Sequence, residues 1–166
     1  MEYAKINNIN NMYNNTPSGY KCPICLAILG IENEDTWIKQ EDIFYRDDLI
    51  LGFISSKFVE GNEGHPLLVP IEHFENIYDL PQDCGNRIFE VAKKTAFALK
   101  EIRGCDGITI LQNNELAGDQ HAFHYHLHIF PRFTDDNFHR NLVKDRVSEP
   151  EERTVYAQEL REYFRR

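Results

Sequence analysis

The stretch that decides the fold is His124-Tyr125-His126-Leu127-His128-Ile129-Phe130, in which histidines alternate with apolar side chains. Successive side chains of a β-strand face opposite sides of the sheet, so residues two apart share a face. The alternation predicts a strand from Ala122 to Phe130, with three imidazoles in a row on one face and apolar side chains facing the core. Three titratable rings side by side cost stability unless they bind something. The row therefore indicates a functional site.

Two kinds of chemistry use such a row of imidazoles. Two or three of the rings can coordinate a catalytic metal, or one ring can attack a phosphorus atom as a nucleophile. A neutral imidazole is nucleophilic near pH 7 without an auxiliary base, which makes the second chemistry feasible. The histidine row by itself leaves both alternatives open.

The rest of the chain favours an α+β fold built on an antiparallel sheet of about five strands. Residues 81–103 carry apolar side chains at a spacing of three to four and precede Gly104, which predicts one long helix packed on the sheet. A C-terminal helix is expected from about Ser148, with the Ser148 hydroxyl as its cap and Glu151 as the capping-box partner. The apolar stripe of that helix would comprise Val155, Tyr156, Leu160 and Phe164. Further strands are expected at 43–45, 49–54, 65–69 and 107–112.

Length and charge restrict the class of protein. The 166 residues fit one domain, in which we distinguish a flexible polar arm at 1–20, a central part at 21–135 and a C-terminal extension at 136–166. Asp and Glu number 27 against 18 Lys and Arg, and the net charge of −9 disfavours nucleic-acid binding. No apolar run is long enough to span a membrane or is typical of a signal core, so we expect a cytoplasmic protein without membrane contact.

Cys22 and Cys25 form a CxxC motif, whereas the other two cysteines, Cys84 and Cys105, stand alone. In a protein without an export signal, a CxxC motif is typical of a zinc half-site, of a redox pair or of two unrelated thiols. The chain has no second CxxC motif. Zinc bound at Cys22 and Cys25 would therefore need two histidines from elsewhere to complete a tetrahedral site.

The histidine segment resembles the hallmark of the histidine triad (HIT) family, His-φ-His-φ-His-φ-φ, in which φ is an apolar residue. Asn113 and Gln120 precede the first triad histidine by eleven and four residues, as similar residues do in the family. The segment 64–73, Gly-His-Pro-Leu-Leu-Val-Pro-Ile-Glu-His, resembles the family motif Gly-His-x-Leu-Val-x-Pro-x-x-His. The resemblance extends over about residues 22–133 and identifies residues 21–135 as a HIT-like domain.

The resemblance implies roles for individual residues. HIT enzymes attack an α-phosphorus with the middle histidine of the triad, which by position makes His126 the nucleophile and the carrier of a covalent nucleotidyl group. His128 would donate a hydrogen bond to phosphate oxygens or to the leaving group. Asn113, Gln120 and His65, together with His128, would bind the substrate. The implied activity is that of a nucleoside phosphoramidate or dinucleoside polyphosphate hydrolase, or of a nucleotidyl transferase.

The resemblance also implies a metal and a partner. One branch of the family binds zinc through a CxxC pair, a histidine upstream of the triad and the first triad histidine, which by position are Cys22, Cys25, His73 and His124. Four protein ligands leave no open coordination position, so this zinc would be structural. HIT proteins commonly pair as homodimers, so we expect a nucleotide substrate and a second copy of the chain as partners.

The sequence departs from the family pattern at two places. Many members carry an Asp for the ribose hydroxyls where Ser55 and Ser56 stand here, and a small hydroxyl residue often stands at the position of His121, which we expect to face solvent. Two rival functions stay open. One is a metal-dependent hydrolase that uses the triad histidines as ligands, and the other is a non-catalytic nucleotide-binding or interaction protein on a zinc-stabilised HIT scaffold.

Overall fold

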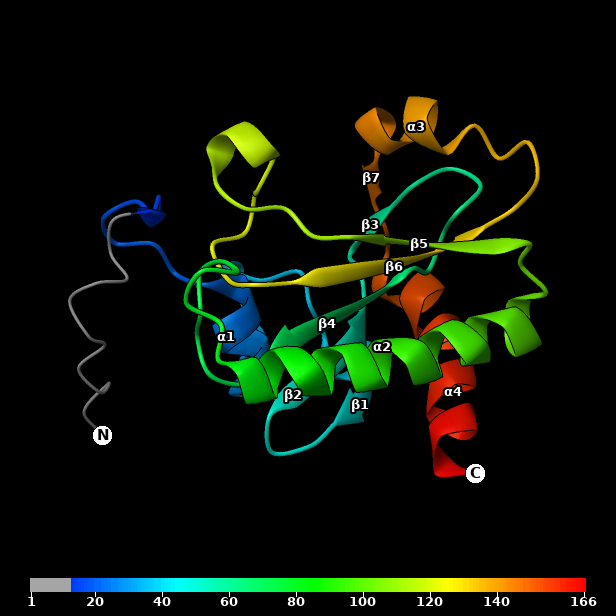
Figure 1. Cartoon of the computed structure of the whole chain (residues 1–166), viewed down its shortest axis with the longest axis horizontal. Coiled ribbons are helices and arrows are strands. Elements are labelled where there is room, and N and C mark those ends of the chain that lie inside the picture. Colours follow the sequence, from blue (N-terminus) through cyan, green and yellow to red (C-terminus); the bar gives the residue numbers. More distant parts are fainter. Residues whose placement is uncertain (1–12) are drawn as a thin grey trace.

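The computed structural model describes residues 13–166, which form a five-stranded antiparallel sheet with helices on both faces (Figure 1). The strands lie in the order β1-β2-β4-β6-β5. Their bounds are Ile43–Arg46 (β1), Ile50–Ile54 (β2), Pro66–Pro70 (β4), Gly107–Leu111 (β5) and Leu127–Arg132 (β6). The structure therefore confirms the predicted α+β fold and the five-stranded antiparallel sheet.

Two long helices cover one face of the sheet. In Figure 1, α2 (Gln82–Arg103, green) runs along the sheet and α4 (Pro150–Arg165, red) lies at the end near β1. The core between helices and sheet includes Ile50, Ile54, Leu68, Leu127 and Ile129 of the strands, Ile88 and Leu99 of α2, and Leu160 of α4. Within residues 13–166, neither these helices nor any shorter one is long and apolar enough to cross a membrane.

The opposite face of the sheet packs against a short helix, α1 (Pro23–Ile28). Because side chains alternate along a strand, the residues next to those of the first core point the other way. Leu51, Phe53, Leu67 and Val69 pack there with Ile24 and Ile28 of α1. The CxxC motif stands at the start of α1, so this second core fixes the motif against the sheet.

The strand that carries the histidines differs from its predicted bounds. We predicted a strand from Ala122 to Phe130, but β6 begins only at Leu127 and continues to Arg132. β4 pairs with β6 at Leu67 and Leu68, and β4 ends at Pro70, which has no N–H to continue a ladder. The preceding segment bends away, and the Tyr125 N–H donates to the Phe74 carbonyl, at 2.6 Å. His124 and His126 therefore precede the strand, and His124 does not share a row with His126 and His128.

The C-terminal extension packs on the sheet and does not form a separate unit. Buried Arg153 of α4 donates to the Asp42 carboxylate, at 2.9 Å, and to the Trp37 carbonyl, also at 2.9 Å.

The predicted helix cap is wrong, because Glu149 and Glu152 form the capping box while the Ser148 hydroxyl donates to the Ser56 carbonyl. The remaining short elements are η2 (Gln40–Asp42), β3 (Lys57–Phe58), η3 (Leu116–Gly118), α3 (Phe138–Asn141), η4 (Leu142–Lys144) and β7 (Arg146–Val147).

The apolar stripe predicted for α4 is correct for three of its four residues. Leu160 belongs to the core, and Tyr156 and Phe164 pack against it. Val155 is exposed instead, at 54%.

The predicted polar arm falls partly outside the described residues, since residues 1–12 are not among them. The part from residue 13 onward contacts the domain. The backbone N–H of Asn15 and the hydroxyl of Thr16 both donate to the carboxylate of buried Glu75. The Tyr20 ring meets the Phe123 ring edge-on, with centroids 5.3 Å apart. Residues 13–20 are therefore attached near the segment that precedes the histidines.

Candidate active site and metal centre

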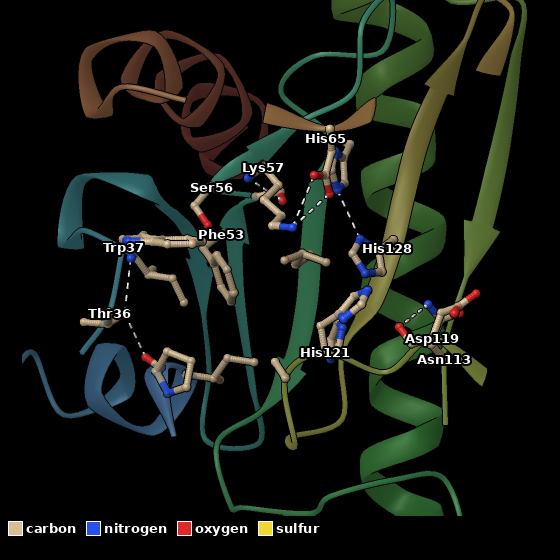
Figure 2. Close-up of a pocket in the computed structure, with 18 of the residues that line it drawn as sticks. Thr36, Trp37, Phe53, Ser56, Lys57, His65, Asn113, Asp119, His121 and His128 are labelled. Carbon is tan, nitrogen blue, oxygen red and sulfur yellow. Dashed lines mark hydrogen bonds and ion pairs between the residues drawn. The ribbon is translucent and has the colours of Figure 1, made fainter. Parts of the chain in front are cut away.

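A cavity of about 750 Å³ opens on the face of the sheet that also carries α1. The strand register places Phe53 opposite Leu67 and Leu67 opposite His128, so these three side chains form a row across β2, β4 and β6. All three line the cavity, as do His126 and His65. Figure 2 shows Trp37 and Phe53 on one side of this cavity and His65 and His128 on the other.

The ring of His126 is fixed by its own chain. Its Nδ1 lies 2.7 Å from the carbonyl oxygen of His124, and a carbonyl can only accept, so Nδ1 carries the proton. In a neutral ring this leaves the lone pair on Nε2. Burial lowers the pKa of His126, and the neighbouring His124 and His121 lower it further although the carbonyl contact opposes them. His126 therefore holds a neutral imidazole with a defined free nitrogen.

His65 and His128 form a second, coupled pair of imidazoles. His65 Nε2 lies 3.1 Å from His128 Nδ1, and the His65 ring stacks on Phe130 with centroids 4.0 Å apart. Burial lowers the pKa of His65 to about 3, with a smaller contribution from His126, and burial also lowers the pKa of His128 well below its usual value. Both rings are therefore neutral near pH 7.

A single arrangement of protons in this pair avoids a buried unpaired donor. His65 Nδ1 is buried and has no hydrogen-bond partner among the described residues. If it carried a proton, that N–H would lose its solvation without compensation. The favourable arrangement puts the proton of His65 on Nε2, where it donates to His128 Nδ1. His128 then carries its own proton on Nε2, as a donor on a side chain that lines the cavity.

The four residues predicted as zinc ligands lie together. The nearest side-chain atoms of Cys22, Cys25, His73 and His124 lie within 4.8 Å of one another. Nδ1 of His124 is 3.5 Å from each sulfur, and Nδ1 of His73 is 3.2 Å from the Cys25 sulfur. Tetrahedral zinc with bonds of about 2.3 Å to sulfur and about 2.0 Å to nitrogen separates such atoms by roughly 3.5 Å. The donor set and its spacing therefore fit a Cys₂His₂ zinc site.

Two further observations fit a metal at this site. Nε2 of His124 lies 3.0 Å from the Pro70 carbonyl oxygen, so Nε2 carries the proton and Nδ1 offers its lone pair toward the sulfurs. The pKa of the Cys22 thiol is lowered, first by a hydrogen bond from Cys25 and then by His124 and His73, although burial opposes this. The same hydrogen bond, together with burial, raises the pKa of Cys25, so one thiol of the pair is ionised first, and zinc binding would displace the proton of the other.

The structure brings Asn113 but not Gln120 to the cavity. Asn113 lines it, and its amide donates to the Asp119 carbonyl, at 3.2 Å. Gln120 is buried and does not line the cavity, and its side-chain amide forms hydrogen bonds with the surrounding backbone. The Gln120 Nε2 donates to the carbonyls of Glu75 and Ala122, while its Oε1 accepts from the Glu115 N–H. Gln120 thus shapes the loop before the histidines, and a direct substrate contact is not supported.

His121 is exposed, as expected, but it also lines the cavity. Ser55 and Ser56 lie in the cavity wall as well. The lining residues that were missed from the sequence include Trp37, Lys57 and Asp145. No local pattern could have found the last two as a pair, because Lys57 and Asp145 are 88 residues apart and meet only through the fold.

Comparisons with known proteins agree on one family. The profile of the HIT domain matches residues 38–135. The chain is 34% identical to Protein hit of Bacillus subtilis over 54% of this chain and 60% of that protein, so the match spans less than two thirds of that relative. It is 33% identical to adenosine 5'-monophosphoramidase HNT1 of Saccharomyces cerevisiae over 42% of each chain. A Zn-bound histidine triad family protein from Mycobacterium smegmatis superposes with a TM-score of 0.68 and 25% identity, covering 87% of this chain and 93% of that one.

Proposed function

This chain belongs to the HIT family, and we propose that it is a nucleotide hydrolase or nucleotidyl transferase that acts at an α-phosphate through a covalent intermediate on His126. The observation that carries the proposal is the 2.7 Å contact between His126 Nδ1 and the His124 carbonyl oxygen. It holds the ring in the tautomer whose free lone pair is on Nε2. A neutral ring in a fixed tautomer beside a large cavity is what attack on phosphorus requires.

The reaction has two steps in this proposal. His126 Nε2 forms a bond to the α-phosphorus while the bond from phosphorus to the leaving group breaks, with the electron pair passing to the leaving group. The Nε2–H of His128 donates to a phosphate oxygen or to the departing atom and so stabilises the charge that develops there. Water or a second acceptor then attacks the phosphorus, which releases His126 and gives the product.

The substrate would bridge the two sides of the cavity. Trp37, whose side chain is half exposed, and Phe53 offer aromatic surface suited to a nucleobase. The histidines on the other side would receive the α-phosphate, with Asn113 as a further polar contact. His65, which is buried, would act on substrate through His128 and is therefore a positioning residue.

The zinc in this proposal is structural. Cys22, Cys25, His73 and His124 would hold it, and four protein ligands leave no position for an activated water. The rival in which all three triad histidines bind a catalytic ion is disfavoured by His124. Its Nδ1 faces the thiols and its Nε2 faces the Pro70 carbonyl, so neither nitrogen is free for an ion shared with His126 and His128.

We also propose that two copies of the chain associate through β5 and α2. β5 is an edge strand of the sheet, and Ile110 on it is 45% exposed. Phe89 and Phe97 on α2 are 58% and 60% exposed, which is unusual for such large apolar side chains in an isolated domain. A second copy would cover these groups and pair the free edge.

Trapping the intermediate tests the catalytic proposal. Wild-type protein is mixed with α-³²P-labelled adenosine phosphoramidate or with labelled diadenosine polyphosphate, quenched rapidly at alkaline pH and denatured. We expect acid-labile label on the protein, because a phosphorus–nitrogen bond survives alkali. Absence of label during measurable turnover would instead favour hydrolysis by metal-bound water, and absence of turnover with every substrate would favour the binding-protein alternative.

A further inference from the structure

An ion pair between Lys57 and Asp145 lies in the wall of the cavity. Lys57 Nζ is 3.2 Å and 3.1 Å from the two carboxylate oxygens of Asp145. Both side chains stay partly accessible, at 44% for Lys57 and 36% for Asp145. Asp145 belongs to the C-terminal extension, beyond the residues that match the HIT domain. The pair plays no part in the chemistry derived above, but it presents a carboxylate and an ammonium group in the lining of the cavity.

The backbone around Asp145 is held firmly. β3 pairs antiparallel with β7, Lys57 opposite Val147 and Phe58 opposite Arg146. The N–H and the hydroxyl of Ser148 both donate to the Ser56 carbonyl, at 2.9 Å and 3.0 Å. Asp145 directly precedes β7, so its carboxylate is presented from an anchored segment. Such fixed placement is typical of a group that positions a ligand.

The pair lies where a bound nucleotide would have its sugar. Figure 2 shows Lys57 between Phe53 on one side and His65 and His128 on the other, with Ser56 next to Phe53. A nucleotide with its base at the aromatic side and its α-phosphate at the histidines must pass its ribose across this middle part. The sugar would therefore lie beside Ser56, Lys57 and Asp145.

The charge of the pair favours a neutral ligand over an anionic one. Asp145 already neutralises Lys57, so the pair offers phosphate little attraction, and the carboxylate would repel a second phosphate group. A carboxylate that accepts from Lys57 keeps further lone pairs, since each oxygen has two. Two adjacent hydroxyls are neutral donors with the spacing of a carboxylate, and hydrogen bonds to a charged acceptor are the stronger kind.

We propose that the Asp145 carboxylate accepts hydrogen bonds from the 2'- and 3'-hydroxyls of the substrate ribose, with Lys57 holding the carboxylate in place. This inference rests on the proposed function for the choice of a nucleotide as ligand. Asp145 thereby makes the C-terminal extension part of substrate recognition. The site distinguishes ribonucleotides from deoxyribonucleotides, because a missing hydroxyl leaves the carboxylate without a donor.

Binding of adenosine 5'-monophosphate and of its 2'-deoxy and 3'-deoxy forms, measured by calorimetry, tests the proposal. The wild type is expected to bind the ribonucleotide at least about tenfold more tightly than either deoxy form. Asp145→Asn should lower the ribonucleotide affinity toward that of the deoxy forms and leave deoxy affinity nearly unchanged, whereas Asp145→Glu should retain part of the preference. Asp35→Asn is the matched control, since Asp35 lines the same cavity and pairs with Lys21 at 2.7 Å, and it should keep the full preference.

Several outcomes would overturn the proposal. They are a wild type that does not distinguish the three nucleotides, an Asp145→Asn variant with an unchanged preference, and a variant that loses affinity for all three equally. Melting curves show whether each variant is folded. If Asp145→Asn does not fold, the ribose preference of Asp145→Glu tests the proposal instead. Binding does not need the nucleophile, so a retained ribose preference without any covalent label on His126 would refute the catalytic mechanism and leave this inference intact.

Discussion

His65 Nε2 lies 3.1 Å from His128 Nδ1, and this contact joins a ring that is 2% exposed to a ring that lines the cavity. Because His65 Nδ1 has no partner among residues 13–166, the proton between the rings belongs to His65. The buried ring thereby decides which nitrogen of His128 is the donor. A residue that touches no substrate in the proposed reaction can in this way control the proton that the reaction uses.

Replacing His65 should therefore change turnover more than binding. His65→Leu removes the donor to His128 Nδ1, so the His128 proton can move to that atom and leave Nε2 without one. We expect kcat to fall by about 10-fold to 100-fold, with nucleotide Kd changed less than about threefold. His65→Gln keeps an N–H donor and should recover much of the rate. An equal loss in both variants, tracking their melting temperatures, would indicate a role in packing alone.

The pH dependence of stability offers an independent test of the neutral His65 ring. Burial lowers the folded-state pKa of His65 to about 3, whereas the unfolded value is near 6.5. Between these values the unfolded state binds a proton that the folded state does not, so stability is greatest above pH 6.5 and falls as the pH is lowered.

The free energy of unfolding of the wild type, compared with that of His65→Gln by urea titration at each pH, isolates this residue. The difference between the two should shrink by up to about 1.4 kcal/mol per pH unit from pH 6 to pH 4. A difference that stays constant over this range would mean that His65 takes up its proton equally in the folded and unfolded states, which would contradict the buried neutral ring. Groups that titrate alike in both proteins contribute equally to the two unfolding free energies, so their contributions cancel in the difference.

The sequence predicted the fold well where the determining signal was local. The apolar spacing of residues 81–103 and the capping Gly104 specify α2, which spans Gln82–Arg103. The histidine alternation identified the right segment but not the bounds of β6, because those depend on where β4 ends at Pro70, more than fifty residues earlier. Alternation along one strand carries no information about its partner.

The candidate site was predictable to a similar degree. The CxxC motif indicated half of a zinc site, the resemblance to the HIT family added His73 and His124, and the structure brings these two histidines together with Cys22 and Cys25. Gln120 has the expected spacing to the triad, yet its amide is used within its own loop, since spacing does not determine the direction of a side chain. Asp145 was missed because only the pairing of β3 with β7 brings it to the cavity.

Zinc content and stability should change together. Protein purified without chelator is expected to hold about one zinc per chain, and Cys22→Ser less than about half an equivalent, with a melting temperature lower by at least about 10 °C. The control Cys84→Ala alters a buried cysteine outside the cluster and should keep its zinc. Chelation that abolished turnover without moving the melting curve would support the catalytic-metal rival, whereas a structural zinc predicts loss of stability first.

Association of two copies should depend on the exposed phenylalanines of α2 and on the edge strand. Phe97→Glu or Ile110→Glu introduces a charge that a buried interface cannot solvate, so either variant should convert a dimer into a monomer. Light scattering after gel filtration measures the mass directly. Val155→Glu changes a similarly exposed side chain on α4, outside β5 and α2, and should leave the mass unchanged. A monomeric wild type would refute the proposed pairing.

Replacing the proposed nucleophile, His126, tests the covalent mechanism most directly. His126→Asn removes the ring nitrogen that attacks phosphorus, while the aromatic side of the cavity, His128 and Asn113 remain in place. We expect nucleotide Kd to change little and turnover to fall by several orders of magnitude, because only the bond-forming step is lost. The variant should also carry no acid-labile label in the trapping experiment. His139→Asn, which alters an exposed histidine on α3, is the control and should match the wild type in all three measurements. Full turnover in His126→Asn, or label equal to that of the wild type, would exclude His126 as the nucleophile, because the reaction or the covalent label would then not depend on its ring.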